Sequence, residues 1–259
     1  MTRVDSGRFG VRLFLLLLSA IVLVTFAAPL PAEGAQNSSP DFSLGEPHVF
    51  IGAHVGMNLP RANSDLFSMV QRELTLEKSD FQAPIFGGDL GITFRSHFAA
   101  VISFDYARTS KASESRNFVE DNGDPIRQTT GFSLMPITGT LRFYPLKLGE
   151  TVGSYVWIPT RILPYVGAGG GIVRYNFSQA GDFVDFRTYD IFSAELESSG
   201  FVPTVHVSGG IDVSLTELIF VNVEARYSWA NADLSRDFSG FEPIDLAGLR
   251  LVGGIYFRF

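Results

Sequence analysis

The sequence predicts an all-β fold, an eight-stranded antiparallel up-and-down transmembrane β-barrel. Three observations predict it. Apolar residues alternate with small or polar residues in eight segments, as they do in barrel strands with one lipid-facing side. The connections between these segments are mostly long and short in turn. Lysine occurs only at Lys78, Lys111 and Lys147, although lysine usually covers much of the surface of a soluble domain.

Residues 1–35 have the pattern of a signal peptide that is cleaved on export. Arginines precede the apolar run Leu13–Ala28, and proline and small residues follow it. The run is shorter than the ~20 residues of a spanning helix, although an uncleaved membrane anchor is the alternative. We expect cleavage near residues 34–36, a short periplasmic segment at 36–46 and the barrel domain at 47–259.

Each of the eight expected strands is long enough for a tilted membrane crossing. Alternation is weakest in 132–144. In chain order, the apolar sets are Val49, Ile51, Ala53, Val55 and Met57 in 48–58; Phe86, Leu90, Ile92 and Phe94 in 85–95; Phe98, Ala100, Ile102, Phe104 and Tyr106 in 98–109; Met135, Ile137, Leu141 and Phe143 in 132–144; Val166, Ala168 and Ile172 in 164–175; Val205, Val207, Ile211, Val213 and Leu215 in 202–215; Ile219, Val221, Val223, Ala225, Tyr227 and Trp229 in 218–229; and Leu249, Leu251, Ile255, Phe257 and Phe259 in 247–259.

The connections predict which way the barrel crosses the membrane. Outer-membrane barrels have long extracellular loops and short periplasmic turns, and an even strand number leaves both ends in the periplasm. The segment 145–162 is intermediate in length, and Tyr155–Ile158 within it could extend a strand. The expected long outer loops are 59–84, 110–129, 176–201 and 230–246, and the expected short turns are 95–98 and 215–217.

Alternation alone does not say which face is inside, because a soluble lipocalin-like barrel has its apolar face inward. The polar face here is rich in small residues and contains no lysine. The apolar face carries aromatic residues near strand ends, as interfacial girdles do: Phe94, Phe98, Tyr227, Trp229 and Phe257. We therefore expect the apolar face to contact lipid.

Two segments resemble a known family. Pro164–Ile172 and the ending Gly253–Phe259 are similar to the small eight-stranded bacterial outer-membrane barrels, the superfamily of outer membrane protein W and the barrel domain of outer membrane protein A. The resemblance covers residues from about 46 to the end. It implies a bacterial outer-membrane location, contact with outer-membrane lipid and lipopolysaccharide, and a C-terminal signal for the barrel-assembly machinery, formed by Ile255, Phe257 and Phe259.

Motifs for catalysis or cofactor binding are weak. The acidic net charge of −7 argues against nucleic-acid binding, and the absence of cysteine excludes disulfides and thiolate sites. The run Gly167–Ile172 does not match G-x-G-x-x-G. The four histidines, His48, His54, His97 and His206, are far apart, so we expect no metal and no cofactor.

A catalytic alternative would place His206, Ser208 and Glu224 together as a lipid-modifying triad on lipid A, if the hairpin at 215–217 sets the register that pairs Glu224 with Ser208. The same three residues are equally expected in any polar barrel interior.

Inward-facing charges are the most informative feature of the sequence. We expect a polar network in the lumen formed by His54, Asp89, Asp105, Arg142, His206, Asp212, Glu224, Arg226 and Arg250. An eight-stranded barrel is just wide enough for side chains to fill it, so these residues form either a plug or a gated path for small solutes. The sequence favours a monomeric, non-enzymatic protein with a structural or surface-interaction role and at most limited solute passage. An extracellular ligand would contact the long loops.

Overall fold

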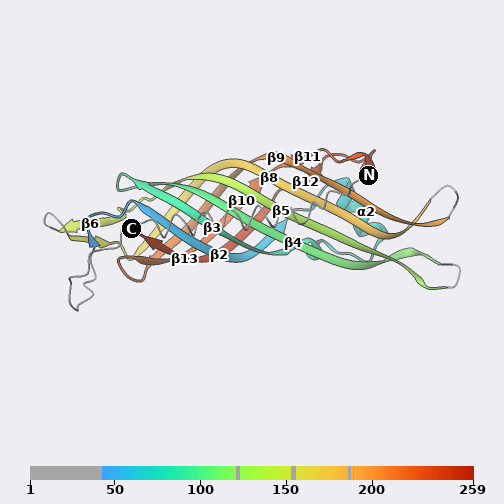
Figure 1. Ribbon diagram of the computed structural model, residues 1–259, viewed down its shortest axis with the longest axis horizontal. Coiled ribbons are helices and arrows are strands. Elements are labelled where there is room, and N and C mark those ends of the chain that lie inside the picture. Colours follow the sequence, from blue (N-terminus) through green and yellow to red (C-terminus); the bar gives the residue numbers. More distant parts are fainter. Residues whose placement is uncertain (1–42, 121–122, 153–155, 186–187, 189) are drawn as a thin grey trace, which may run out of the picture. The chain divides into compact units, whose positions relative to one another are not determined.

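The computed structural model describes residues 43–120, 123–152, 156–185, 188 and 190–259. The expected signal peptide at 1–35 lies outside this range. Eight strands form a closed antiparallel barrel, which confirms the predicted fold class (Figure 1). In barrel order they are β10 (Ile219–Trp229), β13 (Gly248–Arg258), β2 (Val49–Pro60), β3 (Ala83–Phe94), β4 (Phe98–Val119), β5 (Pro125–Phe143), β8 (Ile162–Val184) and β9 (Ile191–Ser214). Among the described residues, no helix is both long and apolar enough to span a membrane.

Alternation along each strand separates an apolar outside from a polar inside. Val55 and Val223 are each 66% exposed, whereas their neighbours His54 and Glu224 are 2% exposed. The sheet closes where β2 pairs with β13, from Gly248 opposite Pro60 to Arg258 opposite Phe50. Because no strand edge is left open at that seam, the backbone polar groups of the barrel wall are paired as a membrane requires.

Two of the expected long loops are largely strand, which corrects the predicted connections at 110–129 and 176–201. β4 and β5 pair as far as Val119 opposite Pro125, with a register shift after Glu114, and β8 and β9 pair as far as Val184 opposite Ile191. These strands continue past α2 to the right-hand end of Figure 1. We call the extended parts the outer sheet: residues 108–119, 125–134, 173–184 and 191–202.

The outer sheet forms because the hydrophobic alternation continues with its phase inverted. Ile172 is exposed on the barrel exterior, but from the next residue the buried apolar side chains are Val173, Tyr175 and Phe177. On β5, Phe132 is buried inward in the same way. Outside lipid, water surrounds the sheet, so the apolar side chains must face inward.

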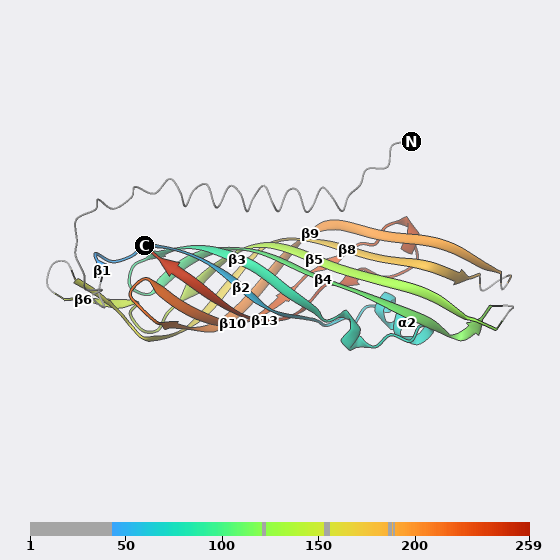
Figure 2. The same ribbon diagram turned by 60° about the horizontal axis from the view of Figure 1, so that its bottom comes forward.

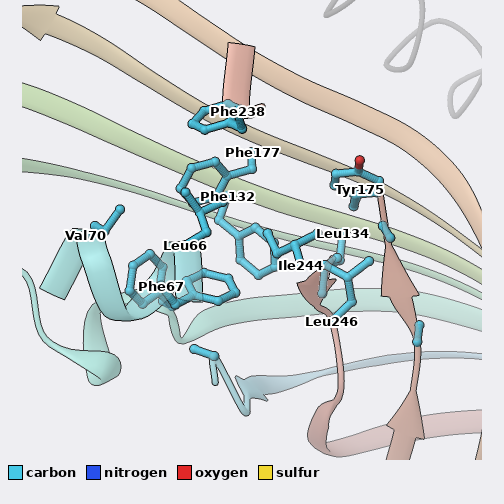
Figure 3. Close-up of a cluster of buried hydrophobic side chains, with 14 of the residues drawn as sticks. Leu66, Phe67, Val70, Phe132, Leu134, Tyr175, Phe177, Phe238, Ile244 and Leu246 are labelled. Atoms are coloured by element: carbon cyan, nitrogen blue, oxygen red, sulfur yellow. The ribbon is translucent and has the colours of Figure 1, made fainter. Parts of the chain in front are cut away.

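The segments 59–84 and 230–246 fold under the inner face of the outer sheet. The first contains α2 (Asp65–Glu73) and the 3₁₀ helix η1 (Lys78–Phe81); the second contains β11 (Asn231–Ala232), the 3₁₀ helix η2 (Arg236–Phe238) and β12 (Ile244–Asp245). Figure 3 shows their side chains meeting those of β5 and β8. We call this cluster the outer core: Ala62, Leu66, Phe67, Val70, Leu74, Leu76, Phe81, Phe132, Leu134, Val173, Tyr175, Phe177, Ala230, Ala232, Phe238, Ile244 and Leu246.

At the opposite end of the barrel lie the short turns, the start of β2 and the end of β13. We call it the turn end. β6 (Gly149–Val152) and β7 (Val156–Pro159) pair there with β1 (Ser43–Leu44) in a separate three-stranded sheet (Figure 2). Val156–Ile158 therefore do not extend a barrel strand, and Tyr155 lies outside the described residues. A second apolar cluster, which includes Phe50, Tyr144 and Phe220, fills the lumen at the turn end.

Candidate functional site

The charged residues predicted to face the lumen lie inside the barrel wall. They come from seven of the eight strands, and alternation aims each of them inward. All nine are between 1% and 6% exposed: His54, Asp89, Asp105, Arg142, His206, Asp212, Glu224, Arg226 and Arg250.

Glu224 on β10 is the central acceptor of this network. Its carboxylate accepts hydrogen bonds from Arg142 at 3.0 Å, from Arg226 at 2.9 Å and from Arg250 at 3.0 Å. The Tyr165 hydroxyl donates to it at 2.8 Å. One carboxylate therefore links four strands of the wall, and charge-assisted hydrogen bonds of this kind are the stronger ones in proteins.

A second group of side chains extends from Arg250 towards β3. Arg250 donates to Asp105, whose other oxygen lies 2.5 Å from His54 Nε2. His54 Nδ1 is 3.2 Å from Asp89, and Asp89 also accepts a hydrogen bond from the Tyr256 hydroxyl at 2.5 Å. His54 thus lies between two carboxylates, so that neither is buried without a partner.

Arg226 anchors the network to the barrel wall on the other side. Its guanidinium donates to Thr138 at 2.8 Å and to Ser103 at 3.3 Å.

Asp212 and Arg142 contact aromatic and amide side chains in the lumen. Asp212 accepts hydrogen bonds from Tyr144 at 2.9 Å and from Asn222 at 2.6 Å. The guanidinium of Arg142 also lies over the Tyr165 ring, at 4.5 Å.

Sequence reasoning missed part of this network. Tyr144, Tyr165, Asn222 and Tyr256 are buried in the lumen and bond its carboxylates, but they were not among the predicted site residues. Their position in the alternation is the signal that could have found them, because Tyr165, Asn222 and Tyr256 lie on the inward side of their strands and Tyr144, directly after β5, continues its inward side.

Glycine makes room for the ion pairs at one point of close approach. A Cβ added to Gly87 on β3 would lie 2.5 Å from Asp105 Oδ1 and 2.7 Å from His54 Nε2. Any larger residue there would push His54 and Asp105 apart.

The geometry disconnects the residues of the catalytic alternative. Glu224 is opposite Gly210, and Ser208 is opposite Arg226, so the hairpin register that would align Glu224 with Ser208 was wrong. His206 Nε2 lies 2.9 Å from Thr140 Oγ1, and Glu224 is occupied by three arginines. Among the described residues, the Ser208 hydroxyl has no hydrogen-bond partner. The catalytic alternative requires a histidine base that is oriented by a carboxylate and hydrogen-bonded to a nucleophile. His206, Glu224 and Ser208 do not form this arrangement.

Other candidate motifs form no site. Within the described ranges, no group of three or more His, Asp or Glu residues is arranged to hold a metal ion. The glycine run of β8 lies in the barrel wall, where a Cβ on Gly169 would collide with the backbone of Gly139 on β5 and lie 2.9 Å from His206 Cε1. Close strand contact explains these glycines.

The barrel exterior is apolar and bordered by aromatic rings at both ends. Phe98 stacks on Phe94 at the turn end, and Trp229 contacts Tyr227 at the opposite end. Ile255, Phe257 and Phe259, the predicted assembly signal, are exposed on this exterior. A closed barrel with an apolar band between aromatic girdles is the architecture of outer-membrane barrels. The chain therefore has the architecture of a transmembrane β-barrel of the outer-membrane type, and its resemblance to the small eight-stranded barrels is confirmed for the fold.

Comparisons with solved structures find distant likenesses. No protein-family model and no curated protein matches the chain. Neisserial surface protein A is 12% identical, with a TM-score of 0.44, over 86% of this chain and 100% of its own. The attachment invasion locus protein Ail of Yersinia pestis, in complex with the heparin analogue sucrose octasulfate, is 12% identical, with a TM-score of 0.40, over 82% of this chain and 99% of its own. The Escherichia coli outer membrane protease OmpT is 10% identical, with a TM-score of 0.37, over 88% of this chain and 99% of its own.

Proposed function

We propose that this protein is a non-enzymatic, non-conducting outer-membrane barrel that acts at the cell surface through its outer sheet. The observation that carries the proposal is the burial of the lumen network. The nine charged side chains are almost completely buried and fill the lumen at their level, so the described residues leave no evident aqueous path through this layer.

The outer core also supports a closed barrel, because it fills the end opposite the turn end. Leu66, Phe67 and Ile244 are completely buried between the outer sheet and the segments that cover it. A solute would therefore meet a packed apolar core in addition to the charged layer. Close-packed protein interiors contain few voids larger than a water molecule.

Conductance in planar lipid bilayers tests the closed lumen. We expect no stable conductance from the unaltered protein. We also expect none from Arg226→Gln, because the outer core still closes the barrel when the charged layer is weakened. Large, stable conductance from the unaltered barrel would refute the proposal in favour of a channel.

The surface role requires that the outer sheet lies outside the cell. The chain contains no cysteine, so single cysteines can be placed at will. Val119→Cys at the exposed end of β4 should react with a membrane-impermeant maleimide on intact cells. Glu217→Cys in the turn after β9 is the matched control and should react only after the outer membrane is opened. The reverse pattern would invert the proposed topology.

The comparisons suggest no more specific role by themselves. The structure of Ail contains a heparin analogue, and OmpT is a protease. An extracellular ligand of this chain would meet the outer sheet and the segments 59–84 and 230–246 first, because they lie at the end of the barrel opposite the turns.

A further inference from the structure

A polar cavity of about 250 Å³ lies at the end of the barrel opposite the turn end, apart from the lumen network. It is formed where β2 ends, where β10 leads into β11 and where β12 leads into β13. The side chains that concern its chemistry are Arg61, Asn63, Trp229, Asn231, Glu242 and Asp245.

Strand alternation places this cavity on the outside of the wall. Arg61 directly follows β2, whose last residue, Pro60, is buried; Arg61 itself is exposed, like Met57 on the outer side of β2. Trp229 shares its side of β10 with Tyr227, which its ring contacts at 4.8 Å between centroids. Asp245 follows Ile244, which is buried in the outer core, and so lies on the opposite side. Since Tyr227 and Trp229 belong to the aromatic girdle, the cavity lies at the membrane surface.

The cavity wall is held by several contacts. The Arg61 amide donates to the Ala247 carbonyl at 2.7 Å, and Arg61 Nε is 3.7 Å from Asp245 Oδ2. Asp245 Oδ1 accepts a hydrogen bond from the Ala247 amide at 2.9 Å. Ala62, between Arg61 and Asn63, is buried with a φ of 45°, a left-handed conformation that is strained for alanine. Strain of this kind persists only where the surroundings fix the backbone, and it is concentrated at functional sites.

The lining excludes three classes of ligand. Glu242 and Asp245 repel anions, and Asp65 in the first turn of α2 adds a further negative charge nearby. No group of three His, Asp or Glu residues in the described chain is arranged for a metal ion. The polar lining disfavours an acyl chain, because the chain would displace water from the polar side chains and offer them no hydrogen bonds in return.

The lining favours a neutral ligand that carries many hydroxyl groups. The amides of Asn63 and Asn231 both donate and accept hydrogen bonds, the two carboxylates accept, and the Arg61 guanidinium donates. Trp229, which is 45% exposed, adds an aromatic side chain to the lining beside these groups. The hydroxyl of Ser64, which also lines the cavity, is buried and has no hydrogen-bond partner in the described chain. The volume corresponds to roughly eight water molecules at ~30 Å³ each, which is enough for one sugar ring.

We propose that this cavity binds a sugar ring, carried by the headgroup of an outer-leaflet glycolipid or by a free saccharide. The site extends the proposed function at the cell surface, because it would give a closed barrel a specific contact with saccharides at the membrane surface. It does not depend on the state of the lumen, so conductance would leave this proposal standing.

The test uses the whole barrel in phosphatidylcholine nanodiscs that contain equal small fractions of a neutral diglucosyl diacylglycerol and of phosphatidylglycerol. Native mass spectrometry measures which lipid stays bound when the disc is removed. Saturation-transfer NMR with maltose measures binding of a free saccharide. The cavity variant is Asn63→Ala with Glu242→Gln, since both side chains are exposed. The matched control is Asn117→Ala with Glu195→Gln on the outer sheet, which makes the same chemical changes away from the cavity.

We expect the unaltered barrel and the control to retain the glycolipid at least fivefold over phosphatidylglycerol, and the cavity variant to lose this preference. A maltose signal that the cavity variant loses, without glycolipid preference, would assign the site to a free saccharide. Equal retention of both lipids with no maltose signal would overturn the proposal, as would glycolipid retention or a maltose signal that the cavity variant leaves unchanged.

Discussion

Replacing Glu224 with glutamine should strongly destabilise the barrel. The change keeps the shape of the side chain and removes its charge. Glu224 is 2% exposed and bonds three arginines, so each of them loses a charged partner. Arg250 retains Asp105, and Arg226 retains Thr138 and Ser103.

The size of the effect is set mainly by Arg142. Its ion pair within the described chain is with Glu224, and its Nε and Nη1 atoms already have no hydrogen-bond partner. Removing one member of a buried ion pair costs about 3–5 kcal/mol, because the remaining charge stays buried without compensation. If the free energy of unfolding falls by ~2 kcal/mol per molar urea, the urea concentration at the unfolding midpoint should fall by about 2 M.

Urea unfolding of the barrel in phosphatidylcholine vesicles measures this midpoint, with the fluorescence of Trp157 and Trp229 as the signal. Glu114→Gln is the matched control. Glu114 pairs with Arg127 at 3.4 Å on the exposed outer sheet, and such surface pairs contribute about 0–1 kcal/mol. The control should therefore unfold close to the unaltered protein.

The double variant Glu224→Gln with Arg226→Gln separates a network from independent contacts. Because the two side chains bond directly, at 2.9 Å, the double change should cost less than the sum of the single changes by about 0.5–3 kcal/mol. If Glu224→Gln shifts the midpoint no further than Glu114→Gln does, or if the single costs add, the lumen charges are not a coupled structural network.

Three further predictions concern the ends of the barrel. Phe67→Ala should lower the free energy of unfolding by about 3–5 kcal/mol, because Phe67 is fully buried in the outer core and its loss leaves a cavity; a cost below 1 kcal/mol in urea unfolding would contradict that packing. Protease added to intact cells should cut the β4–β5 and β8–β9 connections and spare residues 215–218, and cleavage at 215–218 would contradict the proposed topology. Phe259→Ala should slow membrane assembly, followed by gel mobility of the unheated barrel, without lowering the urea midpoint; assembly at the normal rate would remove the proposed signal role.

The barrel strands could be predicted because lipid imposes a simple rule on them. A strand with lipid on one side and a polar lumen on the other must alternate, so segments such as 218–229 and 247–259 were located within a few residues. The inward direction of Glu224 and Arg250 follows from the same rule. Their partners could not be predicted, because hydrogen bonds across the lumen depend on strand stagger, which the sequence does not display.

The outer sheet was missed because the rule changes where the strands leave the membrane. In β8 the apolar side is outward up to Ile172 and inward from Val173. A search for one continuous alternation therefore ends the strand near residue 175, although the β8–β9 pairing continues to Val184. The inversion itself was visible in the sequence, since Val173, Tyr175 and Phe177 also alternate. What the sequence did not show is that α2 and the segment 230–246 cover that inner face.

This inversion also bears on why the barrel should be closed to solutes of every kind. Where the outside faces lipid, the lumen contains Glu224, Arg226 and their partners; where the outside faces water, the interior is the apolar outer core. A polar solute that exchanged its water for the charged layer would lose those contacts in the outer core, which offers few hydrogen bonds in return. An apolar solute that dissolved in the outer core would next have to separate buried ion pairs. Because the outer core opposes polar solutes by itself, weakening the charged layer alone should leave the barrel closed to ions and other polar solutes.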